Sequence, residues 1–160
     1  MRLLLICVGR SKAGPEREMA ARYIERAANA GRALGFSAIA LREVEESRAR
    51  RPEDRKAEEA KEIRSLIPPG ASVVALDETG KSLTSRGFAE FLGRARDESI
   101  ATAALVFGGA DGLDPAFVST ASLVISFGAM TWPHQLVRIM AAEQIYRAIT
   151  ILSGHPYHRD

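Results

Sequence analysis

The sequence predicts a single α/β domain, residues 1–160, with helices on both faces of a mostly parallel sheet in three layers. Short apolar runs alternate with helix-like segments along the whole chain, and no repeat, low-complexity tract or long linker interrupts them. A domain of this size buries roughly 70% of the surface that its unfolded chain exposes. One substantial core is therefore expected.

Five segments are expected to form the strands. They are rich in Val, Ile, Leu and Ala and are bounded by glycine, proline or polar residues, as buried parallel strands are. In chain order they are "RLLLICV" (2–8), "SAIALREV" (37–44), "SVVAL" (72–76), "IATAALVF" (100–107) and "SLVISF" (122–127).

Five segments between and after these strands are expected to be helices. Proline stands at or next to the start of four of them, and Ser85 is expected to cap the third. Gly35 ends the first and "PPG" ends the second. The expected ranges are 15–34, 52–67, 85–98, 114–121, begun by Asp114 and Pro115, and 133–152.

The last helix is apolar around more of its circumference than one stripe requires. Val137, Ala141 and Ile145 lie on one side, while Ile139 and Met140 widen the apolar arc. Such a helix is buried on more than one side, either at the centre of the monomer or against a second chain. We expect a homodimer.

The composition limits the class of protein. Hydrophobic residues at 46% and charged residues at 26% are typical of globular proteins. The apolar run before Gly9 is too short for a signal-peptide core, and no run approaches the roughly 20 residues that span a bilayer. The single cysteine, Cys7, excludes an internal disulfide and suits a reducing compartment. We therefore expect a cytoplasmic protein with no membrane partner.

Positive charge is concentrated in the first part of the chain. Residues 1–64 carry a net charge of +4 and residues 65–160 carry −2. "RPEDRKAEEAKEIR" is interpreted as a solvated helix face on which Arg55 pairs with Glu59. "RARR" at 48–51 lies in an expected loop without an intervening acid, so it is better placed to contact phosphate.

The stretch "LVFGGADGLDP", residues 105–115, places a glycine loop after a strand. Ligands of parallel α/β folds gather at the carboxyl ends of strands, here after 76, 107 and 127. The loop has neither the dinucleotide-binding nor the Walker pattern, and its two aspartates would repel phosphate. By itself it is interpreted as a tight turn, and Asp114 as the cap of the next helix.

The histidines do not form a metal or catalytic set. His155 and His158 lack a third and fourth ligand, since Cys7 lies in a strand and His134 at a helix start. No metal site is therefore expected.

The final segment, "SGHPYHRD", concentrates two imidazoles, a phenol and a guanidinium. These groups can stack on a base, move a proton and pair with phosphate. The alternative is a frayed chain end.

Four motifs occur in order along the chain: "LDETGK", "FGGADG", "MTWPHQLVRIMAAEQIYRA" and "HPYHR". With them the chain resembles the ribosomal RNA large subunit methyltransferase H family of the SPOUT superfamily. The resemblance covers the whole chain and is densest from 72 to 160. It implies a homodimer with a deep trefoil knot in its C-terminal half.

The resemblance also implies an S-adenosylmethionine-dependent enzyme. Its implied reaction is methylation of N3 of a pseudouridine in helix 69 of 23S rRNA, on the assembled ribosome. The matching cofactor-binding positions are Leu76, Gly108, Phe127, Gly128, Ala129, Met130, Thr131 and Trp132. Many relatives have Ser-Lys in place of Gly128-Ala129 and Leu in place of Trp132. If the backbone binds the cofactor, neither difference prevents binding.

For the catalytic side, the tail provides a hypothesis. Tyr157 is expected to contact the base, His155 or His158 to assist proton removal, and Arg159 to hold phosphate. In a dimer the tail of one subunit would complete the pocket of the other. The alternatives are a SPOUT enzyme acting on tRNA or another RNA, and a non-catalytic ribosome-binding factor.

Overall fold

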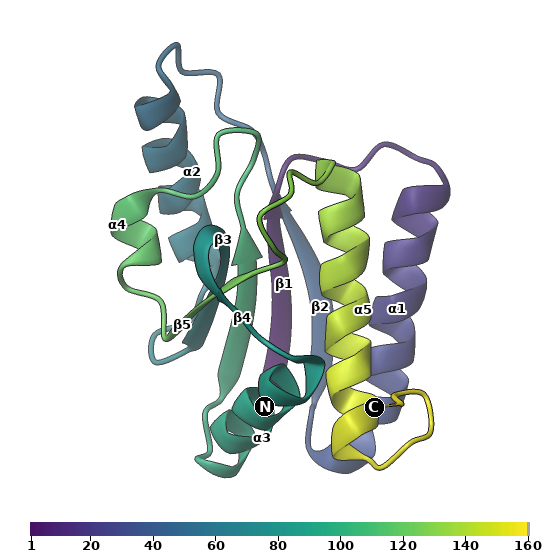
Figure 1. Ribbon diagram of the computed structural model, residues 1–160. Coiled ribbons are helices and arrows are strands. Elements are labelled where there is room, and N and C mark those ends of the chain that lie inside the picture. The colour runs from purple at the N-terminus through teal and green to yellow at the C-terminus, as the bar shows by residue number, and fades with distance from the viewer. Residues whose placement is uncertain (160) are drawn as a thin grey trace.

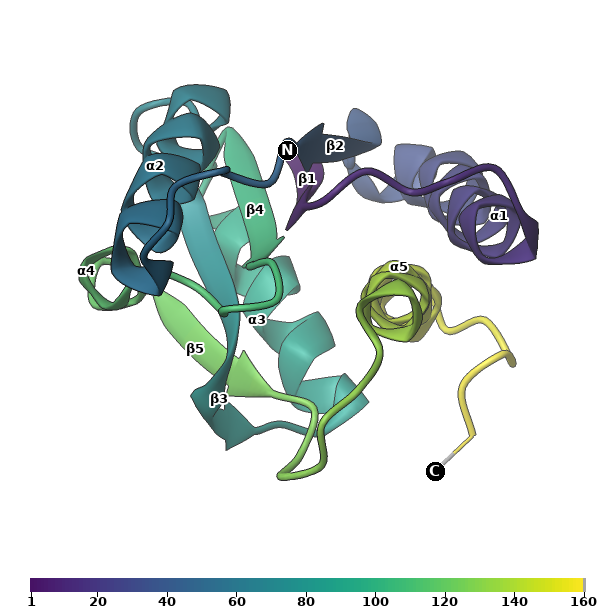
Figure 2. The same cartoon turned by 90° about the horizontal axis from the view of Figure 1, so that it is seen from above.

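A computed structural model describes residues 1–159 and shows helices packed on both faces of a five-stranded sheet (Figures 1 and 2). All strand pairs are parallel, and the strand order is β2-β1-β4-β3-β5. The strands are β1 (Arg2–Val8), β2 (Ala38–Val44), β3 (Ser72–Ser82), β4 (Thr102–Phe107) and β5 (Leu123–Ser126). The expected three-layer α/β class is confirmed.

The helices begin and end close to the expected positions. The first one closes with a short 3₁₀ turn, Arg32–Leu34, and Gly35 then adopts the left-handed conformation. The helices are α1 (Pro15–Gly31), α2 (Pro52–Leu66), α3 (Ser85–Asp97), α4 (Pro115–Val118) and α5 (His134–Leu152).

Two N-caps can be compared with expectation. Asp114 caps α4 as expected, since its carboxylate accepts from the Phe117 amide at 2.8 Å. The cap of α3 is Thr84 rather than Ser85, because the Thr84 hydroxyl accepts the Gly87 amide at 3.0 Å.

Each face of the sheet has its own apolar cluster. One face packs against α1, α3 and α5 through residues such as Ala27, Phe88 and Ile145, and the other against α2 and α4 through Ile63 and Phe117. β4 is buried along its whole length, as a central parallel strand requires. Cys7 is fully buried in β1, as expected.

Helix α5 lies at the centre of the first face, between α1 and α3 (Figure 2). Packing within the monomer therefore explains part of the wide apolar surface of α5. Leu136, at its N-terminal end, is 41% exposed. In residues 1–159 no helix combines the length and apolar character needed to cross a bilayer.

Strand β3 is longer than expected, because it extends to Ser82 and pairs with β5 a second time at Lys81 and Ser82. Leu76 pairs with Ile125, and after a shift in register Lys81 pairs with the same residue. A strand residue has one neighbour along each of its two edges, so the 77–80 segment crosses over β5 at Ile125. Such a crossing is compatible with the knot that the resemblance implies, and the knot stays a prediction.

Glycine is required where the two segments cross. A Cβ atom on Gly80 would lie 2.4 Å from the carbonyl carbon of Ile125 and 2.6 Å from its oxygen. No flexible side chain can yield there, because the contact is with backbone.

We expect Gly80→Ala to lower the free energy of unfolding by about 1–3 kcal/mol, the range for overpacking, in urea denaturation followed by circular dichroism. Gly87→Ala is the matched control in α3. A Cβ there lies 3.4 Å from the Thr84 hydroxyl, and alanine favours a helix, so this variant should keep or gain stability. Equal losses in the two variants would show that the crossing is not the constraint.

Candidate functional site

A cavity of about 690 Å³ lies where β4 and β5 end, beside residues 76–79 of β3. Its walls come from the 76–79 segment, the 107–113 glycine loop and the loop between β5 and α5. These are the three strand ends that the sequence marks for a ligand. Six of the eight expected cofactor-binding residues line it: Leu76, Gly108, Phe127, Gly128, Met130 and Trp132. Ala129 and Thr131 are exposed in the same loop but do not line the cavity.

The glycine loop is a tight turn closed by backbone. The Gly112 amide donates to the Gly109 carbonyl at 3.0 Å, and Gly112 has φ +82°. A Cβ on Gly108 would lie 2.3 Å from the carbonyl carbon of Gly112. Gly108 is therefore required first by the turn itself, and the turn brings bare backbone to the cavity wall.

The loop before α5 is held by a few local hydrogen bonds. The Ser126 hydroxyl accepts the Gly128 amide at 3.1 Å, and the Trp132 indole donates to the Phe127 carbonyl at 3.4 Å. Gly128 has φ +104°, a conformation that suits glycine. Met130 is 75% exposed at the tip of the loop.

Acidic side chains and one cation face the cavity. Asp77 and Glu78 line it, and Asp77 accepts from the Thr79 hydroxyl at 2.6 Å. Asp111 is neutralised by Arg55, whose hydrogen bonds hold the pKa of that carboxyl below its usual range. Among residues 1–159, Lys56 is the only Lys or Arg whose side chain lines the cavity. This wall suits hydroxyl groups and a cation better than a polyphosphate.

His134 forms the floor beside β4 and β1. Its ring lies 5.0 Å from the Phe107 ring, and its Nε2 donates to the Val8 carbonyl at 2.5 Å. Burial lowers the pKa of His134 below the usual 6.5 and outweighs the hydrogen bond to Val8, which raises it. The imidazole is therefore neutral at pH 7.

Arg138 lies one turn further along α5 and is 2% exposed. It forms an ion pair with Glu43 of β2 and donates to the Gly9 carbonyl after β1 at 2.6 Å. The same Glu43 carboxylate accepts the Ser11 amide at 2.8 Å. The start of α5 is thereby tied to the ends of β1 and β2.

The tail lies at the other end of α5 from the cavity (Figure 1). A helix of 19 residues is roughly 28 Å long at 1.5 Å per residue. His155, Tyr157, His158 and Arg159 therefore do not meet the cavity of their own chain.

The tail is nevertheless packed. The Tyr157 hydroxyl donates to Glu143 at 3.0 Å, its ring lies 4.7 Å from Tyr146, and Arg147 stacks over it at 4.9 Å. Burial, followed by hydrogen bonding, raises the pKa of Tyr157 above its usual 10. His158 lies 3.3 Å from Arg147, and the Tyr157 amide donates to His155. The frayed-end alternative is wrong for 155–158.

Several residues at the cavity escaped the sequence prediction. They are Lys56, Asp77, Glu78 and His134. Asp77 and Glu78 stand in the quoted "LDETGK" motif and were available as a signal, whereas Lys56 reaches the cavity from α2 only through the fold. No group of three or more His, Cys, Asp or Glu side chains in residues 1–159 is arranged to hold a metal ion.

Comparison with known proteins identifies the class. The solved probable methyltransferase from Bordetella pertussis Tohama I shares the fold, with a TM-score of 0.52, 17% identity, and coverage of 92% of this chain and 95% of that one. A putative methylase family protein from Neisseria gonorrhoeae has a TM-score of 0.50 at 15% identity, covering 99% and 85%. The family described as predicted SPOUT methyltransferase matches residues 1–158. The chain is therefore a methyltransferase with an α/β fold.

Two relatives define the subgroup. A protein from Beijerinckia indica is 62% identical over 159 residues, 99% of each chain, and one from Methylocella silvestris is 62% identical over 160 residues, 100% of each. Both are named ribosomal RNA large subunit methyltransferase H. The chain belongs to the SPOUT methyltransferases and, within them, to the ribosomal RNA large subunit methyltransferase H family.

The lowered pKa of His134 predicts a pH-dependent stability. The unfolded chain binds a proton on this ring near pH 6.5 while the folded protein resists it, so the contribution is complete above pH 6.5 and is lost as pH falls below it. We expect urea denaturation to show a larger loss of unfolding free energy from pH 7.5 to 5.5 in the wild type than in His134→Gln. The control His155→Gln, in the exposed tail, should follow the wild type. Parallel curves for wild type and His134→Gln would contradict the assignment.

Proposed function

We propose that the protein uses S-adenosylmethionine to methylate N3 of a pseudouridine in helix 69 of 23S rRNA, on the assembled ribosome in the cytoplasm. The observation that carries the proposal is the cavity between residues 76–79 of β3 and the ends of β4 and β5, with its bare backbone and acidic lining. The names of the relatives that are 62% identical support ribosomal RNA as the substrate.

The donor set of the cavity fits this cofactor. Leu76, Phe127 and Trp132 offer apolar surface for an adenine, and exposed backbone at Gly108 and Gly128 allows close approach. Asp77 and Glu78 suit ribose hydroxyls and an amino group. When bound, S-adenosylmethionine supplies an activated methyl group on a sulfonium. It has no phosphate, so a wall with one lysine is sufficient.

The chain's part in the reaction is to exclude water, align the base and remove a proton. The cavity walls hold one partner, and the nitrogen of the base must approach in line with the bond that breaks. Because the pKa of Tyr157 is raised, its phenol stays protonated at neutral pH and serves to stack or to donate a hydrogen bond. Proton removal then falls to His155 or His158, and Arg159 pairs with phosphate.

The position of the tail supports a homodimer. The tail and the cavity of one chain lie at opposite ends of α5 (Figure 1), so a tail that acts on the base must come from a partner. Apolar surface is available for pairing: Met130, Trp132 and Leu136 are exposed, and a second cavity of about 480 Å³ lies over Ile139 and Met140. A homodimer would place one tail at the cavity of the other subunit.

We expect transfer of labelled methyl from S-adenosylmethionine to ribosomes taken from cells that lack the enzyme. Free large subunits and tRNA are parallel substrates. Label in tRNA alone would contradict the proposed substrate. Absence of cofactor binding in calorimetry would favour a non-catalytic ribosome-binding factor.

A chain truncated after Gly154 should keep its cofactor affinity and lose transfer by roughly 10²-fold or more, the scale of general acid–base catalysis. Because Tyr157 packs on α5, the unfolding curve of the truncated chain must be recorded as well. Tyr157→Phe, which keeps the ring, should lose less. Unchanged turnover in a folded truncated dimer would refute the role of the tail.

A further inference from the structure

The segment between β2 and α2, residues 45–51, has no regular secondary structure and is nevertheless anchored. The Ser47 amide donates to Glu59 at 2.9 Å, and the Ala49 amide donates to the Ser47 hydroxyl at 3.1 Å. Arg55 donates to the carbonyls of Ala49 and Arg50 at 3.1 and 3.0 Å. A loop held in this way loses little entropy when it binds a partner.

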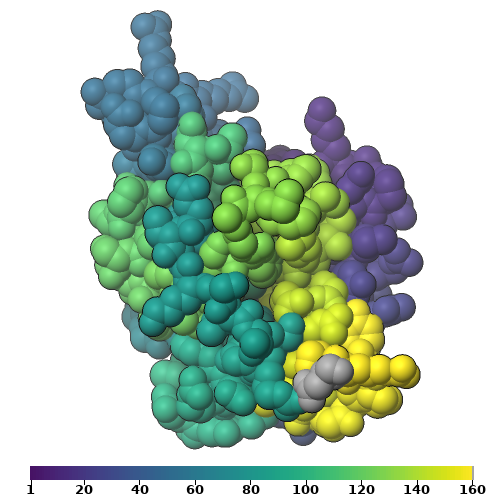
Figure 3. All heavy atoms as spheres, viewed as in Figure 1, coloured from purple at the N-terminus to yellow at the C-terminus, as the bar shows by residue number. Residues whose placement is uncertain are grey.

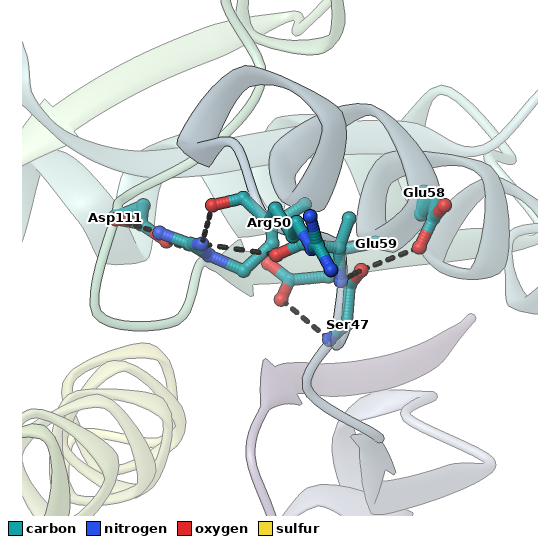
Figure 4. A network of polar contacts seen from close by, with 7 residues as sticks. Ser47, Arg50, Glu58, Glu59 and Asp111 are labelled. Atoms are coloured by element: carbon teal, nitrogen blue, oxygen red, sulfur yellow. Dashed lines mark hydrogen bonds and ion pairs between the residues drawn. The ribbon is translucent and has the colours of Figure 1, made fainter.

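Arg55 also connects this segment to the cavity. From the sequence we expect Arg55 to pair with Glu59. Its guanidinium instead donates to both carboxylate oxygens of Asp111, 56 positions away, at 2.7 and 3.0 Å. The two side chains are 26% and 29% exposed. Asp111 belongs to the glycine turn that lines the cavity. Figure 4 shows Asp111 on one side of this network and Glu59, bonded to Ser47, on the other.

Glu59 lies beside the same turn. It is 6% exposed, and burial raises its pKa. A Cβ atom on Gly109 would lie 3.6 Å from its Oε2. Arg55 therefore ties the anchored segment to the glycine turn, while Glu59 anchors the segment and lies beside the turn.

Among residues 1–159, Arg48, Arg50 and Lys56 take part in none of the ion pairs of this region. Several nearby acids are engaged: Glu45 pairs with Arg10, Glu53 and Asp54 pair with Arg51, Asp111 pairs with Arg55, and Glu58 bonds to Ser47. The side chains of Arg48 and Arg50 are exposed, and Lys56 faces the cavity. The segment before α2 projects from the end of the molecule at which the strands finish (Figures 1 and 3).

We propose that Arg48, Arg50 and Lys56 form a phosphate-binding surface that holds the backbone of the RNA substrate beside the cavity, and that the Arg55–Asp111 bridge fixes this surface relative to the cavity. The surface rests on the proposed function and adds where the RNA lies: across the α2 side of the cavity. Guanidinium groups on an anchored loop suit phosphate oxygens. Residues 45–51 carry no large apolar side chain, which disfavours a membrane or a protein core as partner.

The first test is the double variant Arg48→Ala/Arg50→Ala, assayed for ribosome binding and transfer between 50 and 200 mM salt. We expect a roughly tenfold weaker ribosome affinity, and a slope of log affinity against log salt that is shallower by about 1.5. Cofactor affinity should be unchanged. Arg22→Ala/Arg26→Ala, which removes the same charge from exposed positions of α1, should retain the wild-type affinity and slope.

Arg55→Gln separates the bridge from the surface. Because it frees both the segment and Asp111, we expect it to weaken ribosome and cofactor binding several-fold each, with Arg55→Lys restoring part of both. If Arg55→Gln binds the ribosome and the cofactor as tightly as the wild type does, the Arg55–Asp111 bridge has no positioning role.

A crosslinker identifies the partner. Arg50→Cys can be labelled alone with a photo-activated reagent, because Cys7 is fully buried. We expect nuclease-sensitive crosslinks to RNA, and crosslinks only to ribosomal protein would overturn the proposal. Failure of the wild type to methylate ribosomes would refute the proposed function. Wild-type transfer with unchanged affinity and salt slope in Arg48→Ala/Arg50→Ala would overturn this inference alone.

Discussion

The buried guanidinium of Arg138 is the contact on which the arrangement of the cavity depends. It joins three elements that are distant in sequence, α5, the end of β1 and the end of β2, through Glu43 and the Gly9 carbonyl. Its Nε has no partner among the described residues. The hydrogen bonds of the guanidinium therefore replace only part of the hydration that it loses on burial. Removing one member of a buried pair costs roughly 3–5 kcal/mol, because the other charge stays behind. That penalty holds the start of α5 in one place.

The position of α5 in turn sets one wall of the cavity. The loop from Phe127 to Pro133 enters α5 directly, and His134 and Arg138 fix the first turn of that helix to β1. The opposite wall is the glycine turn, tied to α2 by the ion pair between Arg55 and Asp111. Both walls are therefore fixed by ionic groups from helices on opposite faces of the sheet, while β3 and β4 provide the rigid edge between them. This organisation positions backbone atoms precisely without a phosphate-binding signature.

The fold class and most element boundaries could be predicted because they depend on local pattern. Apolar runs mark the buried strands, and prolines mark the helix starts. The extension of β3 could not be predicted, since "DETGKS" has the composition of a loop and becomes a strand only because Ile125 lies across it. The partner of Arg55 was missed for the same reason: spacing along a helix favours Glu59, but the fold brings Asp111 within 2.7 Å. Glu59 instead serves the backbone of Ser47.

The candidate site also contains residues that the sequence could place and residues that it could not. Residues at strand ends, such as Leu76 and Gly108, could be placed together because the carboxyl ends of parallel strands share one edge. The tail cannot be placed by that rule, since its position depends on the length of α5 and on its packing against that helix. A cavity and a tail at opposite ends of one helix have a simple physical consequence. In the proposed homodimer the tail of one copy acts at the cavity of the other, so assembly and turnover would be linked. A change that weakens the apolar face of α5 would then act on turnover before it acts on cofactor binding.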